Sequence, residues 1–312
     1  MGRPSGCRDA IKAAMHRTIL HTAGILLIIA TSSRAQNSES RGLTFGTSFQ
    51  GSTNSLGTVL KVDAAAGYFF KQYWQIDVGI PFYSVFPSDS SAAGGNTSVR
   101  GIGNVYTQIR FTKVHPTLNY VSTLTATAPT GDRDQGLSTG RVTVDWGNYF
   151  DHSFGRLTPF AEVGIANSVS DTTFLVRPYT TLGLMIRGQA GARVRMTPWA
   201  MLGASGYLIE PAGGQTVFSR VVTRRNSTPQ IPGNVPGSGS VNRLLKPPVF
   251  EENTVTTGSA SIARDRGVSG FLLFGQNPGM NLHVGFTRST QFNLNTVFFG
   301  LGYNLRKPLG GF

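Results

Sequence analysis

Three consecutive residues, Asp151, His152 and Ser153, are of the types that hydrolases use for nucleophilic catalysis. A catalytic serine and its base must meet within hydrogen-bonding distance, and adjacency along a chain does not provide that geometry. Asp132 and Asp134 are similar to the start of a calcium-binding loop, but the further oxygen ligands of that motif are missing. An ordinary polar turn explains them better. We therefore predict no catalytic residue and no metal site.

The remaining chemistry-bearing residue types do not form known cofactor motifs. The chain has five histidines and one cysteine, and their spacing matches no zinc-binding pattern. The glycines include no phosphate-binding or dinucleotide-binding fingerprint between a strand and a helix. No cofactor is predicted.

The charged residues instead alternate with apolar residues along extended segments. Between residues 60 and 70 the even positions are apolar, whereas Lys61 and Asp63 occupy odd positions. The same alternation places Asp77 between Ile76 and Val78. Side chains on a strand point to opposite faces with a period of two, so each segment has one apolar and one polar face.

The length of these segments favours strands that cross a membrane. Most run for about 10–15 residues, and a tilted transmembrane strand needs about 9–11. Twelve strands are predicted, at residues 42–50, 57–70, 73–85, 99–112, 115–128, 139–151, 156–167, 179–195, 198–209, 267–275, 280–289 and 291–305.

The connections between the predicted strands alternate in length. Those after even-numbered strands are short, whereas residues 86–98, 129–138, 168–178 and 210–266 form longer ones. Outer-membrane barrels have short periplasmic turns, long external loops and an even number of strands. The sequence therefore predicts an all-β, antiparallel transmembrane β-barrel of about 12 strands. Residues 210–266 contain six prolines and are either a long external loop or an insert in the lumen.

The beginning of the chain predicts export. Four basic residues precede an apolar run at 19–30, and Ser33-Arg34-Ala35 has the small residues of a signal-peptidase site. Cleavage between Ala35 and Gln36 makes 1–35 a signal peptide and 36–312 the barrel. It removes five basic residues and one aspartate, which lowers the formal charge from +13 to about +9. The expected location is the outer membrane of a Gram-negative-type bacterium.

Two regions resemble a known family. After a predicted strand comes Ala128-Pro129-Thr130-Gly131-Asp132, then the segment 144–150, then Leu157-Thr158-Pro159-Phe160; the hairpin at 280–305 has a similar layout. This pattern resembles the outer-membrane family associated with the MetA pathway of phenol degradation and related channels for aromatic compounds. The resemblance implies a barrel that passes small hydrophobic or aromatic molecules. The insert at 210–266 departs from the family pattern.

The polar faces of the predicted strands supply the candidate functional residues. We expect the following side chains to line the lumen: Lys61, Asp63, Asp77, Arg110, Arg141, Asp145, Glu162, Arg187, Arg193 and His283. A stripe formed by Arg187, Arg193 and Arg195 would favour anionic solutes in an open lumen. The opposite, apolar faces are expected to meet lipid, through Leu60, Val62, Ile76, Val78, Val144, Leu184, Leu282 and Val284.

These patterns leave three hypotheses. The first is a passive channel for small solutes, and the second is a non-conducting structural or surface-interaction barrel whose lumen is closed by its own ion pairs. The third and least favoured is an outer-membrane lipid hydrolase. Expected partners are outer-membrane lipid, including lipopolysaccharide phosphates, and the barrel-assembly machinery, whose signal Gly300, Tyr303 and Leu305 resemble. Nucleic acid is not expected, because the basic residues are dispersed among the strands.

Overall fold

A computed structural model describes residues 41–70, 73–88, 98–132, 135, 137–168, 179–219, 223–224, 250–251, 254–258, 263–277 and 279–308. The predicted signal peptide and its cleavage site between Ala35 and Gln36 lie outside these residues, and so does most of 220–262. Among the described residues, no helix is long and apolar enough to span a membrane.

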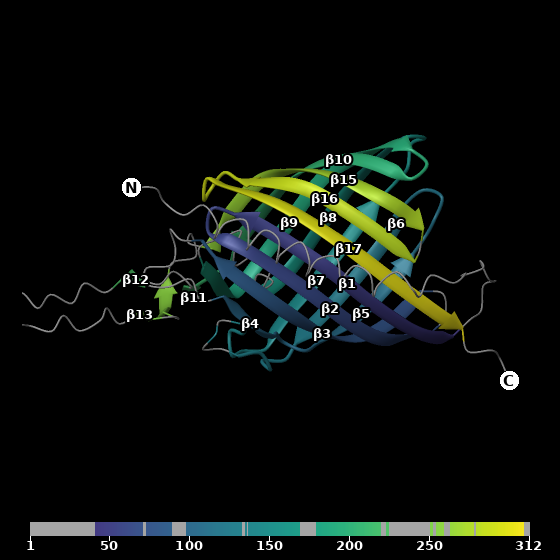
Figure 1. Ribbon diagram of the computed structural model, residues 1–312. Coiled ribbons are helices and arrows are strands. Elements are labelled where there is room, and N and C mark those ends of the chain that lie inside the picture. Colours follow the sequence, from purple (N-terminus) through teal and green to yellow (C-terminus); the bar gives the residue numbers. More distant parts are fainter. Residues whose placement is uncertain are drawn as a thin grey trace, which may run out of the picture. The chain divides into compact units, whose positions relative to one another are not determined.

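The prediction of a twelve-stranded antiparallel barrel is confirmed (Figure 1). The ring closes because the first strand pairs with the last over Gly42–Pro308 to Thr53–Val297. Its members, in ring order, are β1 (Gly42–Asn54), β2 (Gly57–Phe70), β3 (Trp74–Pro87), β5 (Tyr106–Lys113), β6 (Asn119–Thr127), β7 (Thr143–Asp151), β8 (Leu157–Ser168), β9 (Tyr179–Thr197), β10 (Ala200–Pro211), β15 (Asp265–Asn277), β16 (Met280–Ser289) and β17 (Leu294–Pro308).

One predicted strand, 99–112, is divided in two. β4 (Val99–Ile102) and β5 both pair with β3, and residues 103–105 between them leave the regular ladder. Pro81 of β3 has no N–H to donate at this level, and its carbonyl accepts a 2.8 Å hydrogen bond from the Gly103 N–H. A Cβ on Gly103 would lie 2.4 Å from the ring of Tyr83, so only glycine fits here without a shift of that ring.

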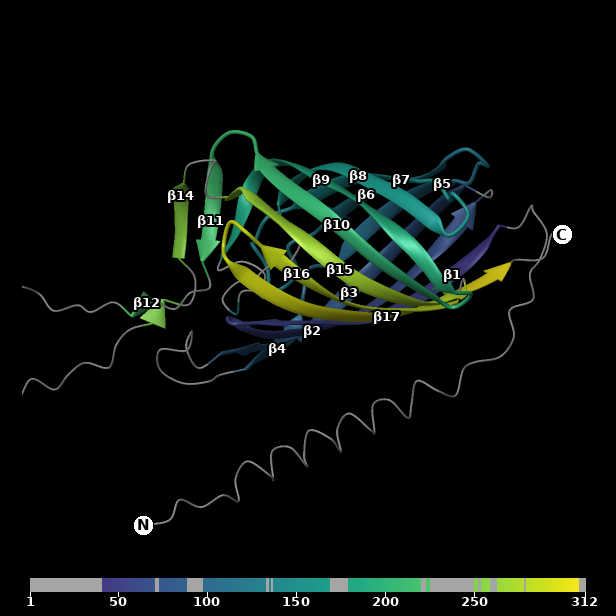
Figure 2. The same cartoon turned by 90° about the horizontal axis from the view of Figure 1, so that it is seen from above.

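The ends of the 210–266 segment continue the barrel ladder. After a bend at Gly213 (φ +82°), β11 (Gln215–Ser219) runs beside the first residues of β9, and β14 (Thr254–Gly258) pairs with β11 (Figure 2). A two-stranded pair, β12 (Thr223–Arg224) and β13 (Phe250–Glu251), lies farther along the same segment. The described part is therefore partly β-structure, which the sequence did not predict.

The barrel has two distinct ends. At the terminal end, Gly42 of β1 lies beside Pro308 of β17, and the connections at 71–73, 114–118, 152–156, 198–199 and 278–279 are short. The opposite, loop end carries the longer connections, including 128–142. One of these returns to the barrel, because Leu137 (2% exposed) packs against Val59, Tyr83 and Val85.

The outer face is apolar and the inner face polar. Val78 on the outer face is 51% exposed, whereas its neighbour Asp77 is 7% exposed. The other side chains predicted to meet lipid are exposed at Val62, Ile76, Val144, Leu184 and Val284, and half-buried at Leu60 and Leu282. A soluble protein shows the reverse arrangement, so this band of exposed side chains suits a hydrocarbon surrounding.

A row of aromatic side chains lies on the outer face at the terminal end. Phe70 stacks on Trp74 with centroids 6.5 Å apart, and Trp74 contacts Phe111 at 4.9 Å. The row continues through Tyr120 to Phe150, with separations of 6.1 and 5.0 Å. Membrane barrels carry such aromatic girdles where hydrocarbon meets the polar headgroups.

Candidate functional site: the barrel interior

Arg187 of β9 is the centre of the first interior cluster. Its guanidinium lies 2.8 Å from Asp145 Oδ1 on β7 and 2.7 Å from Glu162 Oε1 on β8. Two glycines make room for it: a Cβ on Gly147 would lie 2.6 Å from Arg187 Nη2, and one on Gly164 would lie 2.8 Å from Nε. One cation on β9 therefore pairs with two carboxylates, one on β7 and one on β8.

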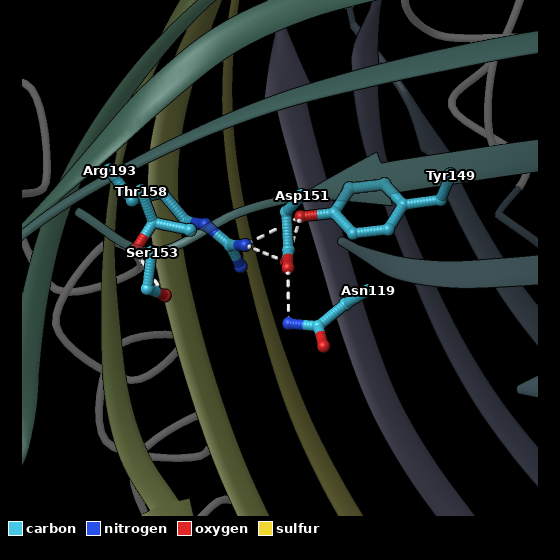
Figure 3. Close-up of polar contacts among 6 residues, drawn as sticks. All are labelled: Asn119, Tyr149, Asp151, Ser153, Thr158 and Arg193. Atoms are coloured by element: carbon cyan, nitrogen blue, oxygen red, sulfur yellow. Dashed lines mark hydrogen bonds and ion pairs between the residues drawn. The ribbon is translucent and has the colours of Figure 1, made fainter. Parts of the chain in front are cut away.

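Arg193, six residues after Arg187 on β9 and nearer the terminal end, is the centre of a second cluster (Figure 3). Its Nη2 donates to Asp151 Oδ2 at 2.6 Å and to the Tyr149 hydroxyl at 2.5 Å. Tyr149 donates to the same carboxylate at 3.0 Å, and Asn119 Nδ2 donates to its other oxygen at 2.8 Å. The guanidinium also lies 5.3 Å from the centroid of Phe160, within cation–π range.

The wall formed by β1, β2, β3 and β5 holds further carboxylates. Asp63 accepts hydrogen bonds from the Tyr106 hydroxyl at 3.0 and 3.1 Å and lies 3.5 Å from Lys61 Nζ. Asp77 accepts from Thr44 Oγ1 at 2.8 Å and from Gln75 Nε2 at 2.7 Å. Both carboxylates are largely buried and both accept hydrogen bonds, as burial of a charge requires.

Apart from the arginines of β9, the wall formed by β9, β10, β15 and β16 carries mostly uncharged polar groups. Gln189 donates to Ser205 Oγ at 2.8 Å, and the hydroxyls of Ser269 and Thr287 lie 2.8 Å apart. Asp265 accepts from Ser289 Oγ at 2.7 Å. A cavity of about 230 Å³ opens on this wall, lined by Glu162, Arg187, Gln189, Tyr207, Asp265, Ser269 and Thr287 among others.

The remaining predicted lumen residues lie apart from these clusters. Arg110 donates to Gln108 at 2.7 Å on the inner face of β5. His283 lies over Gly300, where a Cβ would be 2.1 Å from its ring, and its centroid is 5.9 Å from that of Phe298. Arg141 is exposed in the loop-end connection and does not line the lumen, because β7 begins only at Thr143.

The predicted arginine stripe does not act as an uncompensated positive surface. Arg187 faces two carboxylates and Arg193 faces one, whereas Arg195 is exposed at the terminal end of β9. The sequence located these residues on one strand but not their acidic partners on neighbouring strands. Because carboxylates compensate two of its three arginines, the stripe does not favour anionic solutes as the sequence predicted.

The Asp151-His152-Ser153 run is split among three different environments. Asp151 binds Arg193, Tyr149 and Asn119, whereas the Ser153 hydroxyl lies 3.1 Å from Thr158 Oγ1 (Figure 3). The His152 ring packs edge-on against Phe154 at 4.3 Å. This geometry does not link the three side chains into a proton relay.

Sequence reasoning missed three interior features. Leu137 enters from a connection that the sequence assigned to a polar turn, and Arg306 donates to Gln75 at 3.1 Å from beyond the predicted end of the last strand. Phe160 contacts Phe271, with centroids 6.2 Å apart, across two intervening strands. No alternation marks Phe271 as an inner residue, because residues 271–274 are all apolar.

Comparisons with known proteins bear on the fold alone. No protein-family model and no curated protein sequence matches the chain. An outer-membrane channel from Pseudomonas putida F1 matches with a TM-score of 0.52 and 12% identity, covering 88% of this chain and all of that one. The NanC porin (TM-score 0.44, 6% identity, 84% and 99% covered) and the TodX monoaromatic hydrocarbon channel (0.38, 8%, 88% and 91%) also match. The chain thus has an outer-membrane-type barrel fold, and membership of the phenol-degradation family stays a prediction.

Proposed function

We propose that this protein is a passive channel for small solutes in the outer membrane of a Gram-negative-type bacterium. The apolar outer face and its aromatic girdle support the membrane location. Export by the predicted signal peptide and insertion by the barrel-assembly machinery are part of the same proposal.

The main support for the proposal is that the described interior contacts join strands two or three positions apart in the ring, along the barrel wall. Arg187 and Arg193 on β9 reach carboxylates on β7, two strands away in the ring. Arg306 on β17 reaches Gln75 on β3, three strands away. Contacts between strands so close in the ring lie against the lining and do not cross the lumen. A twelve-stranded barrel has a width between that of filled eight-stranded barrels and that of open sixteen-stranded porins.

The charge balance of the lining favours solutes of low net charge. The described inner faces carry six basic side chains (Lys61, Arg110, Arg187, Arg193, Arg195 and Arg306) and six acidic ones (Asp63, Asp77, Asp145, Asp151, Glu162 and Asp265). A nearly neutral lining selects weakly between anions and cations. The rings of Tyr149, Phe160 and Phe271 also offer inner surfaces for stacking, and we include small aromatic molecules among the solutes.

Planar-bilayer conductance tests the channel directly. The mature protein is expected to conduct, with a reversal potential in a salt gradient close to zero. Arg187→Glu places three carboxylates together and is expected to shift the reversal potential toward cation selectivity. Lack of conductance in several preparations of heat-modifiable, folded protein would contradict the channel and leave the fold untouched.

A matched pair of anions tests the aromatic solutes. Benzoate and cyclohexanecarboxylate share charge and approximate size, but only benzoate has an aromatic face. We expect benzoate to interrupt the ionic current for longer, and Phe160→Leu with Phe271→Leu to abolish the difference. Equal interruption by both anions in the unaltered protein would contradict an aromatic preference.

The packing of Leu137 favours one alternative, a barrel that does not conduct. The connection that carries it turns into the loop end, where the Leu137 side chain meets Val59, Tyr83 and Val85. If this contact closes the lumen, Leu137→Gly should create a conductance that the unaltered protein lacks. The hydrolase alternative predicts lipid hydrolysis that Ser153→Ala abolishes.

A further inference from the structure

An open groove of about 560 Å³ crosses the outer face of β8, β9, β10 and β15. Its floor consists of small residues, Ala161, Gly188, Ala190 and Gly206, and its sides include Val163, Leu208 and Val268. Arg266 and Thr290 line the same groove at the loop end. The groove is therefore apolar along its length and basic at one end.

Two arginines stand on this outer face, close to an exposed ion pair between Arg264 and Glu210 at the loop end. Arg266 is exposed, and its side chain forms no hydrogen bond or ion pair within the described parts of the chain. Arg288, on the adjacent strand, is exposed and held by Asn293 Oδ1 at 2.8 Å and Asn295 Oδ1 at 3.0 Å. Val268 pairs directly with Arg288, so the two arginines are diagonal neighbours on one face.

The strand register gives the groove a direction. Arg288, Val268, Gly206, Ala190 and Ala161 form one continuous row of paired residues across five strands. The row begins next to the loop end of β16 and reaches β8 in its terminal half. A ligand along the row would have one end at the rim of the barrel and the other end deep in the hydrocarbon region.

From this arrangement we infer that the groove binds a phosphorylated, multiply acylated lipid of the surrounding leaflet. Arginine on the outer face is disfavoured against hydrocarbon and tolerated near the interface, where a phosphate supplies the missing counter-charge through charge-assisted hydrogen bonds. The small-residue floor accommodates an acyl chain. The site is separate from the interior and does not depend on conduction.

Binding is tested with purified mature barrel in an uncharged detergent. Lipid A serves as the phosphorylated probe and phosphatidylcholine as the neutral one, with native mass spectrometry and ligand-induced thermal shift as readouts. Lipid A is expected to bind and to raise the melting temperature, whereas phosphatidylcholine is not. Replacing Arg266→Gln and Arg288→Gln together should weaken binding about tenfold or more, since each charge-assisted contact is strong.

Filling the groove tests the acyl chain separately. Ala190→Phe should weaken lipid A binding while both arginines remain. Two control variants, Ala126→Phe on the exposed outer face of β6 and Arg195→Gln at the terminal end, should bind lipid A as the unaltered protein does. Heat-modifiability on a gel identifies the folded variants that enter the comparison.

Three results would overturn the inference. One is undiminished lipid A binding in the folded double-arginine variant, and another is equal binding of phosphatidylcholine. The third is a full thermal shift produced by inorganic pyrophosphate alone, which would mean that the arginines bind free phosphate and that the groove plays no part.

Discussion

Arginines on the inner and outer faces of the barrel have different partners. Inside, Arg187 and Arg193 meet carboxylates at 2.6–2.8 Å within the same chain. Outside, Arg264 pairs with Glu210 at the loop end, but among the described residues Arg266 has no carboxylate partner and Arg288 is held by amide oxygens alone. The net charge of the chain therefore does not predict the charge of the lumen, because the excess of basic residues lies outside the lumen.

The strongest test introduces the same guanidinium on each face. Val78→Arg places it on the outer face, where the cost at the membrane midplane is about 2–4 kcal/mol. Gln108→Arg places it on the inner face, directly opposite Asp77 in the register. We expect the first variant to lose most of its heat-modifiable, folded barrel and the second to keep it. Equal yields would show that the two faces have been assigned wrongly.

A smaller effect is expected when an interior arginine loses its partners. Asp145→Asn together with Glu162→Gln leaves Arg187 without a carboxylate, and these side chains are about one-third exposed. We expect the free energy of unfolding in urea to fall by about 1 kcal/mol, because solvent screens the pair. The reversal potential should also move toward anion selectivity. An unchanged potential would mean that Arg187 does not face the conducting path.

The smallest effect is expected on the outer face. Arg266→Gln removes an exposed side chain that forms no ion pair within the described ranges, so stability in an uncharged detergent should change by no more than about 0.5 kcal/mol. Urea unfolding, measured with and without lipid A, checks this. A large loss of stability without lipid would reveal a structural role for Arg266 and erase the contrast between the faces.

The fold was predictable because strand periodicity is local. Alternation at 58–82 identified both faces of two strands without knowledge of their neighbours, and the lengths of the connections identified the two ends. The break at residues 103–105 was not predictable, since it depends on Pro81 in the strand opposite. A sequence pattern cannot anticipate a defect that a partner strand imposes.

The interior was predictable in composition but not in pairing. Parity placed Arg187, Asp145 and Glu162 on polar faces, yet only the register between strands brings them together. Leu137 could not be found, because a loop that folds inward leaves no periodic signal. Arg288 did leave a signal in the sequence, because it interrupts the apolar series of Leu282, Val284 and Phe286 on the outer face.

The pairing of β1 with β17 has a consequence for how the molecule forms. Gly42 and Pro308 are paired in the ladder although they are 266 positions apart in the chain. Closure of a loop of this length is slow and entropically costly. Until β17 is in place, both β1 and β16 present unpaired strand edges, which are templates for aggregation. The nascent barrel must therefore remain chaperoned from the emergence of its first strand to the arrival of its last.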